Sequence, residues 1–107
     1  MKNRARKYSI LTNDLGVCYV CGSRLDIEKH EVYFGAFRNK SIEYGCIVGL
    51  CHLCHQSGYD AFGNYRKGVH NEPTKELDQR LKKECQRKFE EKYGHDKFME
   101  VFKKNYL

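Results

Sequence analysis

The chain has 107 residues, with 20 Lys and Arg against 14 Asp and Glu, which gives a formal net charge of +6 at pH 7. A chain of this length supports one domain with a modest core, and small cores often depend on a metal ion or disulfides for stability. No apolar run approaches the roughly 20 residues needed to span a bilayer, so we expect no membrane partner. The positive charge is compatible with a polyanionic partner, although a basic surface also aids solubility.

Residues 1–14 are expected to form a basic arm. Its charged side chains cluster near the start: Lys2, Arg4, Arg6 and Lys7. No apolar stretch follows them, so we expect no secretory signal. Together with cysteines that are paired rather than scattered, this favours a reducing, cytoplasmic setting.

The middle of the chain contains short apolar segments between two cysteine motifs. Spaced apolar residues over 25–37 predict a short hairpin or two extended segments, and residues 47–50 predict a strand. Residues 53–59 are expected to begin a helix, and the glycine-rich residues 60–70 to form a loop. The aromatic residues of that loop are expected to pack beneath it: Tyr59, Phe62 and Tyr65.

The C-terminal third predicts helices. Thr74 follows a proline and is a plausible N-cap. An apolar residue then recurs at every fourth position: Leu77, Leu81, Cys85 and Phe89. This stripe predicts a helix of about 20 residues that ends near Gly94, followed by a short helix over 97–104.

Four cysteines form two Cys-x-x-Cys motifs: Cys18, Cys21, Cys51 and Cys54. The 29 residues between the motifs and the pairing within each are typical of a tetrahedral structural Zn²⁺ site. Gly22, directly after the first motif, suits its sharp turn. Disulfides or unrelated core cysteines are the alternatives. The remaining thiols, Cys46 and Cys85, are expected to be small buried hydrophobic groups.

The order of motifs along residues 18–107 resembles the HNH (His-Me finger, ββα-metal) endonucleases. A Cys-x-x-Cys motif is followed by a strand histidine and by an apolar strand that runs into Leu-Cys-x-x-Cys-His. The matching residues are Cys18, Cys21, His30, Leu50, Cys51, Cys54 and His55. Shorter segments are similar to small phage-encoded HNH proteins and to Ref-type recombination-enhancement nucleases: 33–35, 68–70 and 88–94.

The resemblance implies an α+β fold within a single domain, 1–107. After the arm, a small zinc-stabilised, treble-clef-like ββα-metal core would occupy residues 15–71, and a C-terminal helical extension residues 72–107. It further implies DNA as the substrate and Mg²⁺ or Mn²⁺ as a catalytic ion beside the structural zinc. A recombinase or another phage or host protein would be a further partner, and the host cytosol the location.

The resemblance also assigns roles to three histidines. His30 would be the general base, since an imidazole with a pKa near 6.5 is mostly neutral at pH 7. His55, at the first helical turn, would hold the divalent ion. His70 is a candidate further ligand, brought back by the preceding loop. A histidine without a catalytic role remains the alternative for each.

The sequence departs from the family pattern directly before the base. The family usually has an acidic residue or histidine there, whereas this chain has Lys29, which cannot bind a metal ion. Glu28 lies two residues before His30, so both would project from the same face of a strand. Glu28, or alternatively Glu31, could therefore supply the missing carboxylate.

The family asparagine is also absent in register. Cys46 occupies its position, and Asn39 is the nearest substitute. Arg38 and Lys40 lie between the motifs and are candidate phosphate contacts. The basic arm adds three further candidates for DNA binding: Arg4, Arg6 and Lys7.

Two other functions compete with a nuclease. One is a non-catalytic zinc-finger module that binds DNA or protein through a degenerated site, which the incomplete HNH pattern keeps open. The other is a redox protein that uses Cys-x-x-Cys. The pairing of two motifs and the lack of a βαβ pattern argue against redox chemistry.

Overall fold

A computed structural model describes residues 8–59, 62–72 and 75–107. The basic arm residues Arg4, Arg6 and Lys7 and the expected N-cap Thr74 lie outside the described residues. The elements in chain order are β1 (Ile27–Glu31), η1 (Gly35–Phe37), α1 (Arg38–Glu43), β2 (Ile47–Cys51), α2 (His52–His55), β3 (Ser57–Tyr59), β4 (Tyr65–Lys67), α3 (Glu76–Tyr93) and α4 (His95–Phe102).

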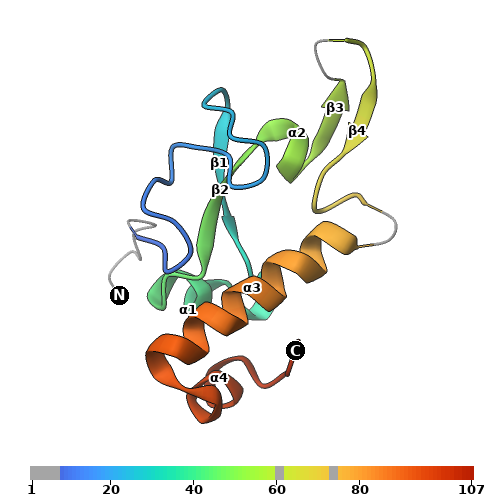
Figure 1. Ribbon diagram of the computed structural model, residues 1–107. Coiled ribbons are helices and arrows are strands. Elements are labelled where there is room, and N and C mark those ends of the chain that lie inside the picture. Colours follow the sequence, from blue (N-terminus) through green and yellow to red (C-terminus); the bar gives the residue numbers. More distant parts are fainter. Residues whose placement is uncertain (1–7, 60–61, 73–74) are drawn as a thin grey trace.

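β1 and β2 form an antiparallel two-stranded ribbon in the middle of the molecule (Figure 1). Every residue of β2 is buried. The segment before the first cysteine motif lies against this strand, because a Cβ on Gly49 would be only 2.4 Å from the carbonyl oxygen of Leu15. Tyr19 donates its backbone N–H to the Gly49 carbonyl at 2.8 Å. Glycine at position 49 thus lets the first motif approach β2 closely.

The segment between the two strands is helical where extended structure was expected. β1 matches the expected first segment, but η1 and α1 occupy residues 35–43. A buried serine stabilises this turn, since the Ser41 hydroxyl donates to the Tyr33 carbonyl at 2.6 Å and accepts from the Tyr33 N–H at 3.1 Å. The prediction of extended structure as far as residue 37 was therefore wrong, because a tertiary hydrogen bond overrides local spacing.

A second antiparallel pair, β3 and β4, extends away from the ribbon as a hairpin (Figure 1). The expected helix over 53–59 ends at His55, and the expected loop contains β4. The returning chain provides the reason, because Val69 and Gly68 donate their N–H groups to the carbonyls of Cys54 and Gln56 at 2.7 and 3.0 Å. Carbonyls at the end of α2 thus find partners without a further helical turn.

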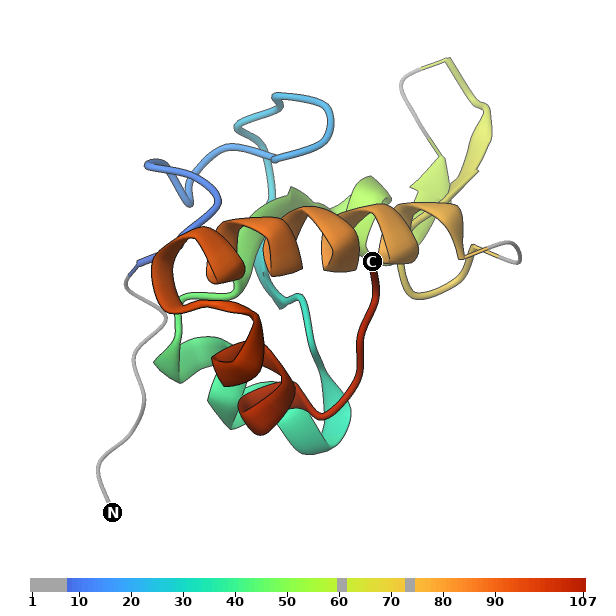
Figure 2. The same cartoon turned by 60° about the horizontal axis from the view of Figure 1, so that its bottom comes forward.

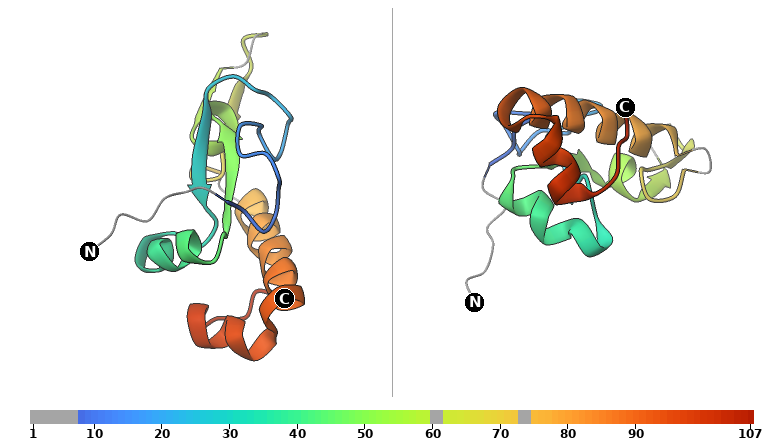
Figure 3. Two further views of the ribbon diagram at one scale, coloured as in Figure 1. Left: turned by 90° about the vertical axis from the view of Figure 1, so that its left-hand side faces the viewer. Right: turned by 90° about the horizontal axis from the view of Figure 1, so that it is seen from below.

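α3 and α4 complete the core (Figures 2 and 3). Gly94, with φ 91°, makes the turn between them. Leu81, Cys85 and Phe89 are fully buried, so the apolar stripe of the predicted helix faces inward. Aromatic rings from distant segments meet beneath it, with Tyr33 and Phe102 centroids 4.4 Å apart. Among the described residues, no helix has the length and apolar character that crossing a bilayer would require.

The same hydrophobic core includes the cysteine motifs. Cys18, Cys51 and Cys54 belong to one buried cluster with Leu81 and Phe89. The α+β class is thus confirmed, with two small sheets, helices, and a cysteine cluster joined to the core.

We predict that Leu81→Ala lowers the free energy of unfolding by about 2–5 kcal/mol, because it empties fully buried space beneath α3. Urea denaturation followed by circular dichroism would measure the loss. Lys83→Ala, at an exposed position of the same helix, is the matched control and should change stability little. Equal stability of the two variants would contradict the packing.

Candidate metal centres

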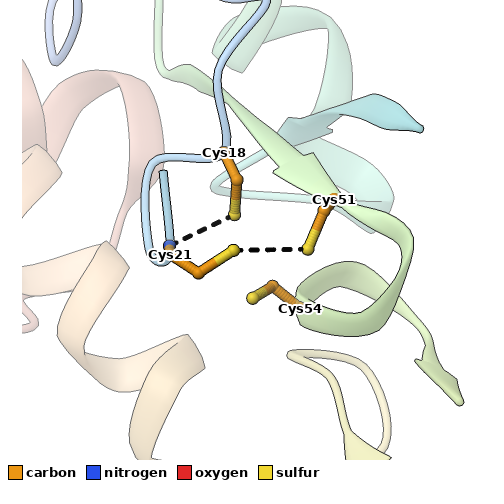
Figure 4. Close-up of side chains that lie close together, drawn as sticks. All are labelled: Cys18, Cys21, Cys51 and Cys54. Carbon is orange, nitrogen blue, oxygen red and sulfur yellow. Dashed lines mark hydrogen bonds between the residues drawn. The ribbon is translucent and has the colours of Figure 1, made fainter. Parts of the chain in front are cut away.

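The four motif cysteines converge from three segments (Figure 4). Their sulfur atoms all lie within 4.8 Å of one another, and the Sγ atoms of Cys21 and Cys51 are 3.6 Å apart. The backbone N–H of Cys21 donates to the Cys18 sulfur at 3.4 Å. Four sulfurs in this arrangement are the donor set of a closed tetrahedral zinc site.

The electrostatics of the cluster favour a bound cation. Burial disfavours ionisation of Cys18, but N–H groups of Cys51 and Cys21 outweigh it and lower its pKa to about 6. Burial and the neighbouring Cys51 and Cys18 thiols raise the pKa of Cys54. Four thiolates this close would repel one another strongly, and a dication removes that penalty. The sulfur cluster therefore fits Zn²⁺.

Three histidines form a second cluster. His30 comes from β1, His55 from the end of α2 and His70 from the chain that follows β4. One ring nitrogen of each lies within 4.8 Å of the others, and the Nε2 atoms of His55 and His70 are 3.0 Å apart. That separation is compatible with two ligands of a single ion. The structure thus brings together the three histidines singled out in the sequence.

A glycine makes the position of His70 possible. A Cβ on Gly68 would come within 2.6 Å of the His55 carbonyl carbon and 2.7 Å of Gln56 backbone atoms. Only a residue without a side chain fits this crossing. The His70 N–H then donates to the His55 carbonyl at 3.3 Å, which fixes the two residues side by side.

Glu28 orients His55 from behind. Its Oε1 lies 2.7 Å from Nδ1 of His55, and its Oε2 lies 3.1 Å from Nδ1 of the exposed His52. The hydrogen bond from His55 is the leading cause of a lowered Glu28 pKa. A carboxylate on Nδ1 favours the tautomer whose Nε2 lone pair is available to a metal ion. The structure therefore supports Glu28 as an outer partner of His55 rather than as a direct ligand.

His30 is the most buried member of the cluster, with 2% of its surface exposed. Its Nε2 has no hydrogen-bond partner among the described residues. Burial, reinforced by the nearby His55 and His70, lowers its pKa to about 3. His30 is therefore neutral at physiological pH, with a ring nitrogen in need of a partner.

The donor atoms of this cluster test which ion fits. Imidazole nitrogen suits zinc and other transition ions, whereas Mg²⁺ prefers oxygen ligands and water. The residues present therefore fit a transition ion such as Zn²⁺ best, and they fit Mg²⁺ less well.

Helix α3 contributes residues that the sequence analysis missed. The Phe34 ring lies 5.2 Å from the His70 ring, and the Lys82 ammonium lies 4.5 Å above Phe34. Lys82 also donates to Asp78 at 2.9 Å, and both side chains are largely buried. The available signal was an oppositely charged pair at i and i+4 adjoining the apolar stripe of the helix. Phe34, Asp78 and Lys82 together form the wall of the histidine site on the side of α3.

Other candidates lie away from the cluster. Asn39 is exposed on α1, which lies at the opposite end of the ribbon from α2 (Figure 1), so the fold does not bring it to the histidines. Cys46 is fully buried in the core. Lys29 alternates with Glu28 and His30 along β1 and projects from the other face, so it leaves the cluster undisturbed.

The two basic candidates between the motifs are exposed and paired with acids. Arg38 lies 3.1 Å from Glu31, and Lys40 lies 3.9 Å from Glu43. The Lys40 pair is exposed and long and is therefore weak, whereas the Glu31 side chain that binds Arg38 is largely buried. Both cations still reach solvent, where a phosphate can contact them. The pairing also engages Glu31, the alternative carboxylate, with Arg38.

Comparisons of this chain with protein-family models, curated proteins and solved structures gave no match.

We predict one tightly bound zinc ion at the four cysteines. Cys54→Ser should abolish its retention and lower the melting temperature sharply, because metal-binding energy contributes to folding at such a site. Elemental analysis of purified protein would measure the stoichiometry. Cys46→Ala removes a buried thiol outside the motifs and should leave the zinc content unchanged. Zinc-free wild-type protein would rule the site out.

Proposed function

We propose that this chain is a metal-dependent, HNH-type endonuclease that hydrolyses DNA phosphodiester bonds. The observation that carries the proposal is the convergence of His30, His55 and His70 beside a four-cysteine cluster. The cluster's Cys54 directly precedes His55, so zinc would hold the helical turn that presents this ligand. The resemblance in motif order and the positive net charge agree with a DNA substrate.

In this proposal each side chain of the histidine site has a separate role. Nε2 of His55 and of His70 would hold a divalent ion, and Glu28 keeps His55 in the required tautomer. Such an ion supplies Lewis acidity toward phosphate and lowers the pKa of bound water. His30 would accept the proton of the attacking water. Its low pKa is a property of the protein alone, because a phosphate anion brought next to it would stabilise the imidazolium.

Finer features of the proposal follow from the same resemblance. The core around the zinc would be treble-clef-like, and Mg²⁺ or Mn²⁺ would be the catalytic ion. A phage origin, the cytosol of the host and a recombinase partner belong to this proposal as well.

One observation favours a second function, a non-catalytic zinc-binding module. His30 is almost wholly buried, and its pKa of about 3 makes it a weak proton acceptor. A general base works best when its pKa lies near the operating pH. If His30 instead binds an ion as a third ligand, the cluster would be a second structural site.

Substitution of His30 separates the two functions. In a nuclease, His30→Ala and the more space-filling His30→Gln should slow nicking of supercoiled plasmid by about 10²–10⁴-fold while leaving Mn²⁺ binding unchanged. His55→Ala should lose both plasmid nicking and Mn²⁺ binding. Binding would be followed by the loss of the free Mn²⁺ signal in electron paramagnetic resonance.

The exposed His95, the first residue of α4, is bound to Glu90 of α3 and provides the control. His95→Ala should keep wild-type cleavage and Mn²⁺ affinity. If wild type binds Mn²⁺ but cuts neither duplex nor single-stranded DNA with any divalent ion, and His30→Ala loses Mn²⁺ binding, the structural site is correct.

Glu28→Gln tests the orienting carboxylate. Gln retains the size but accepts a hydrogen bond from His55 less strongly, so we expect Mn²⁺ affinity to fall by about 10–100-fold. Glu43→Gln, on the far end of the ribbon, is the matched control and should change nothing. The same titration would measure both variants. Unchanged affinity in Glu28→Gln would remove Glu28 from the site.

A further inference from the structure

The β3–β4 hairpin exposes aromatic side chains. The exposed fractions are 71% for Tyr59, 89% for Phe62 and 54% for Tyr65. The expectation that these rings pack beneath a loop was therefore wrong. Exposed aromatic groups gathered on one protruding element indicate a binding surface rather than a contribution to stability.

The two tyrosines form a pair on one face of the hairpin. Tyr59 and Tyr65 are directly opposite each other in the register, with ring centroids 5.1 Å apart at an angle of 65°. The Tyr65 hydroxyl donates to Ser57 at 3.2 Å, which holds its ring against the strand. An edge-to-face pair leaves a ring face available to a flat ligand group.

The two faces of the hairpin differ. Gly58 and Arg66 share the other face, where a Cβ on Gly58 would come within 2.9 Å of Leu53 in α2. At Gly58 that face lies against α2, whereas Arg66 is exposed. Lys67 alternates with Arg66 and projects from the tyrosine face. The tyrosine face thus combines stacking surface with positive charge, which is the chemistry of single-stranded nucleic-acid binding sites.

The hairpin also lies directly between two residues of the histidine cluster in the chain. It begins two residues after His55 and ends three residues before His70. Gly68 and Val69 bind the backbone of α2, which fixes the base of the hairpin to the helical turn that carries His55. A strand held on the tyrosines would therefore contact the element that connects His55 to His70.

We infer that the tyrosine face of the hairpin binds unpaired bases of the DNA substrate, with Lys67 on the adjoining phosphate. This inference rests on the proposed nuclease function and narrows its substrate to DNA with single-stranded character near the cleaved bond. Stacking suits such DNA because unpaired bases expose their flat faces, whereas a duplex buries them.

The test is fluorescence anisotropy with a labelled single-stranded oligonucleotide and a duplex of equal length, without added divalent ions so that binding precedes any cleavage. Wild type should bind the single strand more tightly. Tyr59→Ala and Tyr65→Ala should each weaken that binding by about 5- to 150-fold and leave duplex binding nearly unchanged. Tyr59→Phe and Tyr65→Phe keep the ring and should bind like wild type.

Two matched substitutions test the face. Lys67→Gln should reduce the salt dependence of single-strand binding by about 0.7 in the slope of log K against log salt, the value for one lost phosphate contact. Arg66→Gln removes the same charge from the other face and should have a smaller effect. Leu25→Ala removes an equally exposed apolar group outside the hairpin and should have none.

The outcomes separate this inference from the proposed function. Loss of single-strand binding in the tyrosine variants supports the hairpin site even if wild type never cuts DNA, in which case only the nuclease proposal fails. If wild type cuts DNA but the tyrosine variants bind every oligonucleotide as wild type does, the hairpin inference is wrong. Tyrosine variants that change self-association or protein binding alone would likewise overturn it and assign the face to a protein partner.

Discussion

The convergence of four sulfurs is the constraint on which the rest of the structure depends. It ties the loop of the first motif to the end of β2 and the start of α2, three segments with little regular structure of their own. α2 has only one turn, and helices this short are not stable alone. Two sets of contacts hold the shape of α2 and the position of His55. Cys54 belongs to the sulfur cluster, and the backbone N–H groups of residues 68–70 bind carbonyls at the end of the helix. The position of His55 thus depends in part on the cysteine cluster, through its neighbour Cys54.

The sequence predicted features that arise from local pattern or from covalent spacing. The Cys-x-x-Cys motifs, the strand before Cys51 and the helix with Leu81 on its stripe are of this kind, and the structure places them as expected. Prediction from the sequence failed where tertiary hydrogen bonds decide the conformation. Ser41 turns the chain after β1 into a helix, and Gly68 ends α2 early by crossing its last turn. Neither contact leaves a periodic signal, because both join residues that are paired only in the folded chain.

The candidate site, like the fold, was predicted from the sequence only in part. The three histidines were identified, but their wall was not, because Phe34, Asp78 and Lys82 come together only when α3 packs against the segment that follows β1. This wall matters for the chemistry. Lys82 places a positive charge near His30, one cause of its lowered pKa. A cation there opposes protonation of His30 in the free protein and attracts a phosphate, whose charge would then make the protonated form accessible. In the proposed nuclease, His30 would therefore act as a base only when the substrate is bound.

The β3–β4 hairpin also connects two of the three histidines through the backbone. His55 and His70 flank it in sequence, and the backbone hydrogen bond from the His70 N–H to the His55 carbonyl joins them across its base. A ligand that tilts the hairpin must therefore either move both histidines together or strain the bond between them. Because a Cβ at position 68 has no room against His55 and Gln56, the crossing leaves little freedom for sliding. In the proposed nuclease, a strand bound to Tyr59 and Tyr65 would act on His55 and His70 as one unit, so that binding of unpaired bases would be coupled to the geometry of the histidine cluster. The element inferred to bind the bases is also the element that connects His55 to His70, so recognition of the substrate in the proposed nuclease would need no separate moving lid.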